Sequence, residues 1–280
     1  MDKIINVKEI VENSKALLKE RVEKLKAKNI NPKLAVIIAN DLDSTKLYIK
    51  NKKKLAKEIG IEIEEIVYDI NVTNEEINKK IEELNNDKTV HGILVQLPLY
   101  DILKEEEIIY KIAKEKDVDC FNPYNLGKIM LGKTNLYPCT PKGIIKILEA
   151  TGEKIEGKHA VVIGRSNIVG KPIAQMLLSK NATVTVCHSK TVDLKEETLR
   201  ADILIVAAGV PHFINKEMIK QGSIIIDVGI NRVNGKVIGD VDTEDCIEKV
   251  KFITRVPGGV GLTTVLSVME NLCDLIEENQ

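Results

Sequence analysis

Two residues that could share proton chemistry lie in the first quarter of the chain. Tyr48 and Lys52 stand four residues apart in a segment with a helical pattern. Residues at that spacing lie on one face of a helix, so a phenol and an amine can act together there. The local alternative is a surface tyrosine in the lysine-rich turn at 50–54.

Further polar side chains fall where a strand or a turn is expected. Gln96 closes the apolar run 93–95 just before a proline, and ligands of open α/β sheets bind at the carboxyl ends of strands. The local alternative is a strand-end amide with no ligand. Asp117 and Asp119 place two carboxylates in a turn, where aspartates commonly act as caps.

A glycine turn in the second half has the form of a phosphate site. The apolar run 161–163 leads into a turn with Gly164 and Gly170, and a helical pattern follows from Ile173 to Leu178. Such a turn directs backbone N–H groups and the positive helix end at one point. The spacing is not G-x-G-x-x-G, because Ser166 replaces the second glycine, and a plain strand–helix junction is the alternative. Arg165 and Ser166 add a guanidinium and a hydroxyl that suit a phosphate.

The next strand indicates which dinucleotide this turn would hold. The run 182–187 alternates like a strand and ends at His188, Ser189, Lys190 and Thr191. An NAD site usually has an acidic residue here for the ribose 2′-hydroxyl. The first acidic residue is Asp193, and a hydroxyl and cations precede it. The pattern favours a 2′-phosphate, and therefore NADP.

Bulk properties exclude several classes. The 280 residues carry 41 basic and 42 acidic side chains, so no overall basic charge favours nucleic acid or an anionic membrane. The N-terminus lacks the apolar core of a signal peptide, and no apolar run approaches the roughly 20 residues that span a bilayer. The cysteines are odd in number and form no C-x-x-C pair, which argues against a disulfide framework and a zinc site. We expect a cytoplasmic protein without a metal.

Strand and helix patterns alternate along almost the whole chain, which predicts an α/β protein with mostly parallel sheets. We expect helices over 7–28, 44–59, from Thr73 and over 263–278, and strands over 34–39, 61–68, 90–98, 160–163, 182–187, 203–207 and 224–228. The proline- and glycine-containing segment 122–141 is interpreted as the crossing between two domains. The first domain would hold residues 1–138 plus 265–280, and a Rossmann-type domain would hold 139–264, with a cleft between them.

Taken together, the motifs resemble one family along essentially the whole chain, the bifunctional methylenetetrahydrofolate dehydrogenase/methenyltetrahydrofolate cyclohydrolases. The matching segments occur in the order and spacing of that family. They are Tyr48-x-x-x-Lys52, Val95-Gln-Leu-Pro-Leu99, Lys116-Asp-Val-Asp119, Asn122-Pro-Tyr-Asn125, Pro138-Cys-Thr-Pro141, Gly164-Arg-Ser-x-x-Val-Gly-x-Pro172, Cys187-His-Ser189, Gly239-Asp-Val241 and Val256-Pro-Gly-Gly-Val-Gly261.

The resemblance implies two reactions in sequence. NADP⁺ would oxidise 5,10-methylenetetrahydrofolate to the 5,10-methenyl form, and hydrolysis would give 10-formyltetrahydrofolate. Lys52 would be the central residue of the hydrolytic step and would need a lowered pKa to act as a base. Gln96 would orient its amine, Asp119 would bind the pterin, and Tyr48 would stack on the p-aminobenzoyl ring.

The resemblance also implies the remaining contacts. Pro257, Gly258 and Gly259 would line the folate pocket. Around the cofactor stand five residues, which are Gly164, Arg165, Ser166, Ser189 and Ile230. Arg165, Ser166 and Ser189 would surround the 2′-phosphate, and Ile230 would line the nicotinamide side. A homodimer joined through the nucleotide domain is implied as well.

Three residues depart from the family pattern. Cys120 stands where a glycine is expected, and Arg255 and Leu262 each replace an expected proline. The turn that aims Asp119 could therefore differ, and so could the glycine-rich loop. A dehydrogenase with weak or absent cyclohydrolase activity is the alternative within the family.

Three other classes of protein fit the sequence less well. Short-chain dehydrogenases use the Tyr-x-x-x-Lys pair after the cofactor glycines, whereas here the pair precedes them by more than a hundred residues. A non-catalytic NADP sensor would have lost Lys52, Gln96 or Asp119, and all three are present. A hydroxy-acid dehydrogenase would need a histidine beside the nicotinamide. Of His91, His159, His188 and His212, only His212 follows a turn that could lie there.

Overall fold

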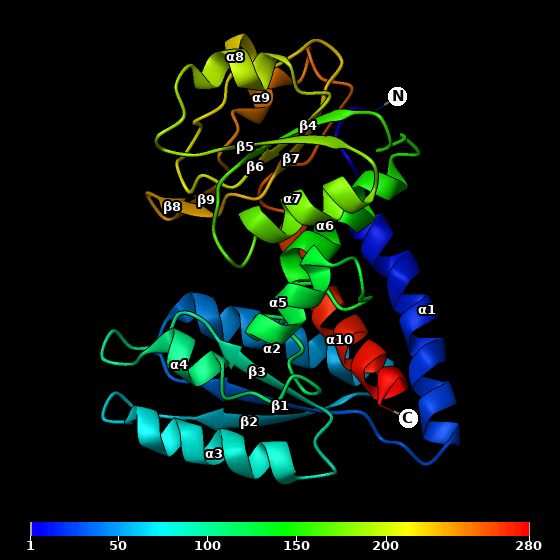
Figure 1. Cartoon of the computed structure of the whole chain (residues 1–280), viewed down its shortest axis with the longest axis vertical. Coiled ribbons are helices and arrows are strands. Elements are labelled where there is room, and N and C mark those ends of the chain that lie inside the picture. Colours follow the sequence, from blue (N-terminus) through cyan, green and yellow to red (C-terminus); the bar gives the residue numbers. More distant parts are fainter. Residues whose placement is uncertain (1, 280) are drawn as a thin grey trace. The chain divides into compact units, whose positions relative to one another are not determined.

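The chain forms two compact α/β units in a computed structural model that describes residues 2–279 (Figure 1). The three-stranded unit comprises Asn13–Cys139 together with the residues from Val265 on. The five-stranded unit comprises the residues up to Glu12 together with Thr140–Thr264. The prediction of an α/β chain with mostly parallel sheets is confirmed, because all strands of the two larger sheets run parallel.

The three-stranded sheet has the order β2-β1-β3. Strand β1 (Lys33–Ile38) is central, and β2 (Glu62–Val67) and β3 (Gly92–Gln96) flank it. The apolar runs of β1 and β3 are buried nearly throughout, as is usual for parallel strands covered on both faces. Edge strand β2 contains three glutamates and three apolar residues, and all of its residues are exposed or half-buried. The carboxyl ends of all three strands therefore lie along one edge of the sheet.

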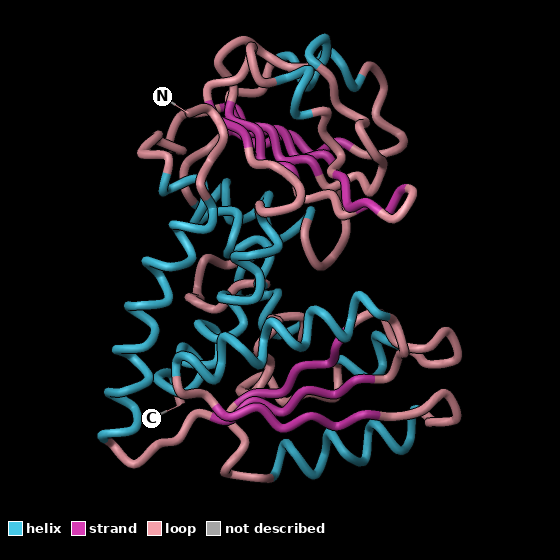
Figure 2. The backbone as a smooth tube through the Cα atoms, turned by 180° about the vertical axis from the view of Figure 1, so that it is seen from behind, coloured by secondary structure: helices cyan, strands magenta, loops and turns pink. Residues whose placement is uncertain are grey.

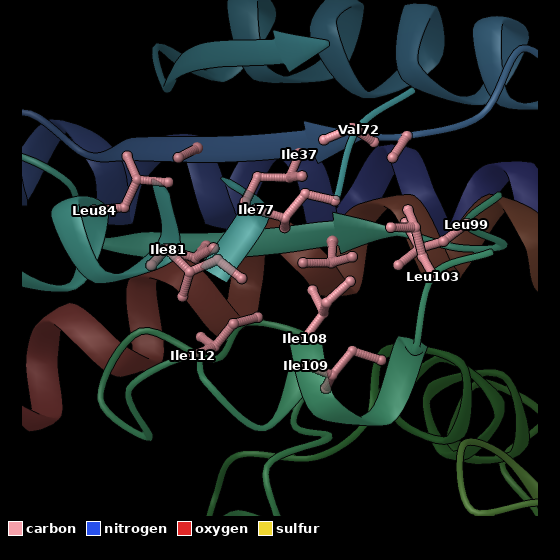
Figure 3. Close-up of a cluster of buried hydrophobic side chains, with 14 of the residues drawn as sticks. Ile37, Val72, Ile77, Ile81, Leu84, Leu99, Leu103, Ile108, Ile109 and Ile112 are labelled. Atoms are coloured by element: carbon pink, nitrogen blue, oxygen red, sulfur yellow. The ribbon is translucent and has the colours of Figure 1, made fainter. Parts of the chain in front are cut away.

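One face of this sheet packs against helices α3 (Asn74–Asn86) and α4 (Glu105–Ile109) (Figure 3). Side chains at every second strand position point to the same face. The core here contains Ala35, Ile37, Ile93 and Val95 from the strands, Ile77, Ile81 and Leu84 from α3, and Ile108 and Ile109 from α4. Helix α3 begins directly after Thr73, close to the predicted start, and Thr73 and Glu76 form a reciprocal capping box there.

The opposite face is covered by long helices. Helices α1 (Val7–Ala27), α2 (Asp43–Ile59) and α10 (Val260–Glu278) begin within a few residues of the predicted starts. A side chain at Gly92 would overlap Leu272 of α10, so that helix lies directly on the sheet. Arg21 of α1 forms ion pairs with Asp274 and Glu277 of α10. Gln96, at an even-numbered strand position, faces this helical side.

The segment predicted as the crossing contains more regular structure than expected. Helix α5 (Pro123–Met130) begins where the Asn122 side chain accepts a hydrogen bond from the Tyr124 N–H. Helix α6 (Cys139–Ala150) follows after a turn. The proline at 123 is compatible with this helix because the first helical position has no intrahelical N–H bond to lose. The chain therefore stays in the three-stranded unit as far as Cys139.

The five-stranded sheet has the order β10-β7-β6-β4-β5. Its strands are β4 (His159–Ile163), β5 (Thr183–Cys187), β6 (Ile203–Val206), β7 (Ile224–Asp227) and β10 (Phe252–Ile253). The chain leaves β4 for β5 on one side and returns to β6 on the other side. That reversal is a topological switch point, where open α/β sheets bind ligands. Figure 2 shows these strands as one twisted layer.

Short elements complete this unit. Helices α7 (Gly170–Ser179) and α8 (Leu194–Leu199), the 3₁₀ turn η1 (Lys216–Met218), strands β8 (Asn231–Val233) and β9 (Lys236–Ile238) and helix α9 (Thr243–Cys246) connect the strands. Helix α7 begins three residues before the predicted periodic segment, because the glycine at 170 itself enters the helix. The N-terminal segment belongs to this unit, since Ile4 pairs with Ile253 of β10. Within residues 2–279, no helix is both long and apolar enough to cross a membrane.

Candidate active site

A buried lysine is the centre of the polar cluster in the three-stranded unit. Lys52 lies on the inner face of α2, and its side chain belongs to a residue only 3% exposed. Its Nζ donates a 2.8 Å hydrogen bond to Gln96 Oε1 at the end of β3. Burial lowers the pKa of the Lys52 amine, and the charge of Asp119 opposes this shift. Desolvation favours the neutral amine, which is the form that can accept a proton.

Hydrogen bonds at both atoms of its side-chain amide hold Gln96 in one orientation. Its Oε1 accepts from Lys52, while its Nε2 donates to the backbone oxygen of Leu97 at 2.9 Å. The amide oxygen is thereby the end that faces the amine. A glutamine oxygen can stabilise an ammonium without adding a second negative charge to the cluster.

Tyr48 lies one turn before Lys52 on α2, as their spacing predicts. The Lys52 Nζ is 4.9 Å from the centroid of the Tyr48 ring, within cation–π range. The tyrosine is half-buried. The ring therefore has an accessible part and a part against the amine, which suits a planar ligand that must lie beside the lysine.

Asp119 reaches the cluster because its segment runs alongside β3. Asp117 pairs in parallel with Ile93, and the Ile93 N–H donates to Lys116 O at 2.7 Å. Continuing that register by two residues places Asp119 beside the end of β3. Burial raises the pKa of the Asp119 carboxyl, while Lys52 and a hydrogen bond from Cys139 oppose the rise. The two ionisable groups thus face each other in a poorly solvated site.

Asp117 has a different task from Asp119. It is fully buried, and its carboxylate accepts from the N–H groups of Phe121 and Asn122 and from Nδ2 of Asn125. Burial raises the pKa of Asp117 to about 6. These bonds shape the turn that follows Asp119, so the capping role considered for the aspartates applies to Asp117.

Cys120, one of the departures, adopts a left-handed backbone with φ +58. Glycine has no steric penalty in this conformation, which explains why glycine is expected there. The thiol is fully buried and donates to Leu136 O at 3.6 Å. The turn is therefore formed with cysteine at this position, and Asp119 still faces Lys52.

A residue that the sequence analysis missed ties this turn in place. Asn271 of α10 is fully buried, and its Nδ2 donates to Val118 O and Tyr137 O, each at 2.7 Å. It also lies 3.5 Å from Cys139 Sγ. The available signal was an asparagine inside the mostly apolar stretch 265–273. A buried amide is usually hydrogen-bonded, so an asparagine in such a stretch indicates a structural hydrogen bond.

The second group of predicted residues lies in the five-stranded unit, around the turn between β4 and α7. Gly164 has φ +129, and a Cβ there would lie 2.5 Å from Ala207 O. A Cβ at Gly170 would collide with Gly164 O. Both positions therefore require glycine, because the turn approaches the loop after β6 and then folds onto itself. This close-fitted backbone next to a helix N-terminus fits the diphosphate of a dinucleotide.

The polar side chains of this turn are accessible. Arg165 and Ser166 are exposed, and so is Ser189 after the neighbouring strand β5. Ser166 Oγ accepts from the N–H groups of Val169 and Gly170 at 3.2 and 3.3 Å, and its own hydrogen is still available to donate. Cation and hydroxyls thus stand at the carboxyl ends of two adjacent parallel strands, an arrangement that fits a 2′-phosphate.

The remaining predicted residues lie elsewhere in the same unit. Ile230 follows β7 and is 64% exposed. Pro257 and Gly258 are exposed in the loop before α10, with Gly258 at φ +99, whereas Gly259 is buried. A Cβ at Gly259 would lie 2.5 Å from Arg255 O, so this position requires glycine. The Arg255 side chain is exposed, so the loop can accommodate it in place of the expected proline. Lys52, Gln96, Tyr48 and Asp119 belong to the other unit.

Comparison with known proteins gives a consistent result for both halves. Residues 5–119 match the family model for the tetrahydrofolate dehydrogenase/cyclohydrolase catalytic domain. Residues 138–280 match the model for the NAD(P)-binding domain of the same family. A protein of Acetivibrio thermocellus named bifunctional protein FolD is 50% identical over 270 residues, which cover 96% of this chain and 95% of that protein.

Solved structures agree with this assignment. The bifunctional FolD methylenetetrahydrofolate dehydrogenase/cyclohydrolase of Campylobacter jejuni has a TM-score of 0.96 at 44% identity, with 99% of each chain covered. The FolD methylenetetrahydrofolate dehydrogenase-cyclohydrolase of Trypanosoma brucei, solved with NADP cofactor and an inhibitor, has a TM-score of 0.93 at 33% identity. It covers 99% of this chain and 97% of that one.

Proposed function

The chain belongs to the tetrahydrofolate dehydrogenase/cyclohydrolase family, and we propose that it catalyses both reactions named there. It oxidises 5,10-methylenetetrahydrofolate to the 5,10-methenyl form with NADP⁺ and hydrolyses that product to 10-formyltetrahydrofolate. The observation that carries the hydrolytic half is the buried Lys52 amine, hydrogen-bonded to Gln96 and facing Asp119. The glycine turn with Arg165 and Ser189 supports the dinucleotide half.

In the hydrolytic step, Lys52 moves protons at two stages. A water oxygen bonds to the cationic bridge carbon, and the neutral Lys52 amine accepts the proton that this water loses. The bond from the bridge carbon to N5 then breaks as the adduct's hydroxyl releases its proton to solvent and becomes the formyl carbonyl, and the first proton returns from the lysine to N5. The formyl group remains on N10. Gln96 Oε1 holds the ammonium form in place between the two stages.

Asp119 and Tyr48 orient the folate around that amine. The Asp119 carboxylate pairs with N–H donors of the pterin. Its negative charge also limits how far burial lowers the pKa of Lys52. The Tyr48 ring stacks on the p-aminobenzoyl group. Pro257, Gly258 and Gly259 are assigned to the lining of the folate pocket as well.

In the oxidative step, the chain's task is to bind and orient. The hydride-accepting chemistry for this oxidation would be supplied by bound NADP⁺. Gly164 and the start of α7 would hold the diphosphate. Arg165, Ser166 and Ser189 would hold the 2′-phosphate, and Ile230 would line the nicotinamide side. Alignment of two reacting carbons is a positional effect, so no acid–base residue is assigned to this step.

We also infer a cytoplasmic homodimer joined through the five-stranded unit. Strand β5 is an edge strand of that sheet, and Val186 on it is 40% exposed. An exposed apolar edge is a natural surface for pairing with a second copy. Light scattering on a size-exclusion column tests this, and a monomeric mass at micromolar concentration contradicts it.

Two absorbance assays test the enzymatic proposal. Purified protein with methylenetetrahydrofolate and NADP⁺ is followed for formation of the methenyl absorbance. Methenyltetrahydrofolate is then supplied alone, and its decay is compared with the buffer rate. Formation and accelerated decay are both expected. Formation without accelerated decay would indicate the dehydrogenase-only alternative, and neither signal would refute the folate assignment.

A further inference from the structure

A buried aspartate in the five-stranded unit binds two loops that follow neighbouring strands. Asp240, after β9, is fully buried. Its Oδ2 accepts from the N–H groups of Ala208 and Gly209 at 2.7 and 2.8 Å, and its Oδ1 accepts from the Val210 N–H at 3.0 Å. Oδ1 also accepts from Asn231 Nδ2 at 2.8 Å. One carboxylate thus holds three consecutive amides of the loop after β6 and the side chain of Asn231, which begins β8 directly after the loop that follows β7.

The two loops lie at the carboxyl edge of the sheet, beside the glycine turn. Residues 207–210 directly follow β6, and residues 228–230 directly follow β7. The first loop approaches the turn closely, because the space at Gly164 is filled by Ala207 O. Strands β4 and β6 flank the topological switch point, so the loop that Asp240 binds forms one side of the ligand crevice.

The arrangement leaves Asp240 no alternative position. Its own N–H donates to Asp227 Oδ1, and the Val241 N–H donates to Asp227 Oδ2, both at 3.0 Å. A side chain at Gly229 would collide with Asp240, and one at Gly239 would collide with Asp227. Two carboxylates are buried together here, and burial raises the pKa of Asp227 to about 6. Such an arrangement is costly for a fold to maintain.

The hydrogen bonds to Asp240 are what keep the loop after β6 in one conformation. Gly209 and Val210 are exposed and belong to no helix or strand. Hydrogen bonds to a charged acceptor are roughly twice as strong as neutral ones. The adenosine-side residues Arg165 and Ser189 follow β4 and β5 instead. The carboxylate therefore acts on the half of the crevice that lies away from the 2′-phosphate.

We propose that Asp240 is a positioning residue that fixes the nicotinamide half of the NADP site. It does so by fixing the position of the loop after β6 relative to the segment around Ile230. This inference rests on the proposed function for the identity of the ligand. Asp240 contacts neither reactant. Its effect falls on the alignment of the nicotinamide and not on affinity for the adenosine end.

The test uses Asp240→Asn, which keeps the shape but presents an amide group to amide donors. Three quantities are measured on the full chain. They are dehydrogenase turnover at saturating NADP⁺, the fluorescence of bound NADPH, which reports the nicotinamide surroundings, and the affinity for adenosine 2′,5′-bisphosphate, which lacks nicotinamide. The matched control is Asp242→Asn, two residues away. The Asp242 side chain accepts from the Asp245 N–H at the start of α9 and lies 3.9 Å from His212 Nδ1, but within residues 2–279 it forms no hydrogen bond with the loop at 207–210.

We expect dehydrogenase turnover to fall about tenfold to a hundredfold, since a misplacement near 1 Å can cost that much. The fluorescence of bound NADPH should change, while the bisphosphate affinity and cyclohydrolase activity stay within about twofold of wild type. Unchanged turnover overturns the proposal. So does a parallel loss of bisphosphate affinity, because that would show a general structural role.

A second variant keeps the inference testable if Asp240→Asn does not fold. Asn231→Ala removes one donor to Asp240 and leaves the three backbone bonds, so a smaller loss of the same pattern is expected. Wild-type protein that binds NADPH but does not oxidise methylenetetrahydrofolate would refute the proposed function alone. The fluorescence and bisphosphate measurements would then still decide the role of Asp240.

Discussion

The Lys52 cluster and the glycine turn differ in how the chain prepares each for its ligand. Lys52 is a buried side chain on a long helix, and its chemistry depends on a pKa lowered by desolvation. The glycine turn uses backbone shape, and its charged residue Arg165 is exposed. A proton-transfer group must be poorly solvated to have the required pKa. A phosphate site needs only donors and positive charge in the right place.

The largest effect should come from removing the buried amine. Lys52→Met should lower cyclohydrolase turnover by about 10²–10⁴, the usual contribution of general acid–base catalysis. Dehydrogenase activity should survive in part, because positioning drives that step. The two absorbance assays give both rates. Lys53→Met is the control, since this neighbouring lysine is solvent-exposed and pairs with Glu65. Hydrolysis near the wild-type rate in Lys52→Met would remove the role of the lysine.

Substitution in the glycine turn should affect the dehydrogenase reaction and leave the cyclohydrolase reaction unchanged. Arg165→Gln should reduce the preference for NADP⁺ over NAD⁺ by about 10–100-fold, because a charge-assisted bond to phosphate contributes roughly 1.5–3 kcal/mol. Cyclohydrolase activity should be unaffected. Arg200→Gln is the matched control, as Arg200 pairs with Glu197 at the end of α8. Equal losses with both cofactors would show that Arg165 binds something other than the 2′-phosphate.

The pH dependence separates the two regions further. Because burial lowers the pKa of Lys52, the neutral amine is populated at lower pH than for an ordinary lysine. Cyclohydrolase kcat/KM should rise about tenfold per pH unit below that pKa and level off above it. Rates measured as a function of pH should show this limb for hydrolysis, at lower pH than an ordinary lysine would give, and not for Arg165-dependent cofactor selection. A flat hydrolysis profile would mean that the lysine does not change protonation state over the pH range measured.

The same comparison shows what the sequence could predict. The alternation of apolar runs sufficed for the parallel α/β architecture, because parallel strands are buried on both faces and read as continuous apolar segments. The i, i+4 spacing placed Tyr48 beside Lys52. Helix α7 began earlier than predicted because glycine carries no apolar signal. The pairing of Ile4 with Ile253 was not predictable, since two single residues far apart carry no periodic pattern.

The residues that support the sites were harder to find than the residues in them. Asn271 and Asp240 were not predicted as supporting residues, because their role is defined by backbone atoms that come from distant segments. A pattern of residue types reports which face of an element is buried, but not which carbonyl or N–H that face meets. The same limit applied to Cys120, whose left-handed φ is visible only in the structure.

Asn271 offers a test of whether the Lys52 cluster depends on its support. Asn271→Ala removes the amide donor to Val118 O and Tyr137 O. Val118 O keeps the Cys139 thiol as a donor at 3.4 Å, whereas Tyr137 O loses its bond to Asn271, at a cost of about 1–3 kcal/mol. Asp119 should then be less well fixed, and cyclohydrolase turnover should fall about tenfold with a lowered melting temperature. Asn279→Ala is the control, because Asn279 donates from an exposed site beyond the same helix. Loss of stability without loss of hydrolysis would limit Asn271 to a structural role.

The smallest effect is expected at Cys120, where the chain departs from the family pattern. Cys120→Gly relieves a left-handed conformation that costs about 1–2 kcal/mol. It also loses a buried thiol and gains freedom in the unfolded chain, which cost a similar amount. The melting temperature should therefore shift by only a few degrees, and the ratio of the two activities should stay within about twofold. Thermal unfolding and the two assays measure this. A large gain in hydrolysis would show instead that the cysteine had misdirected Asp119, and that the turn, rather than Lys52, limits the second reaction.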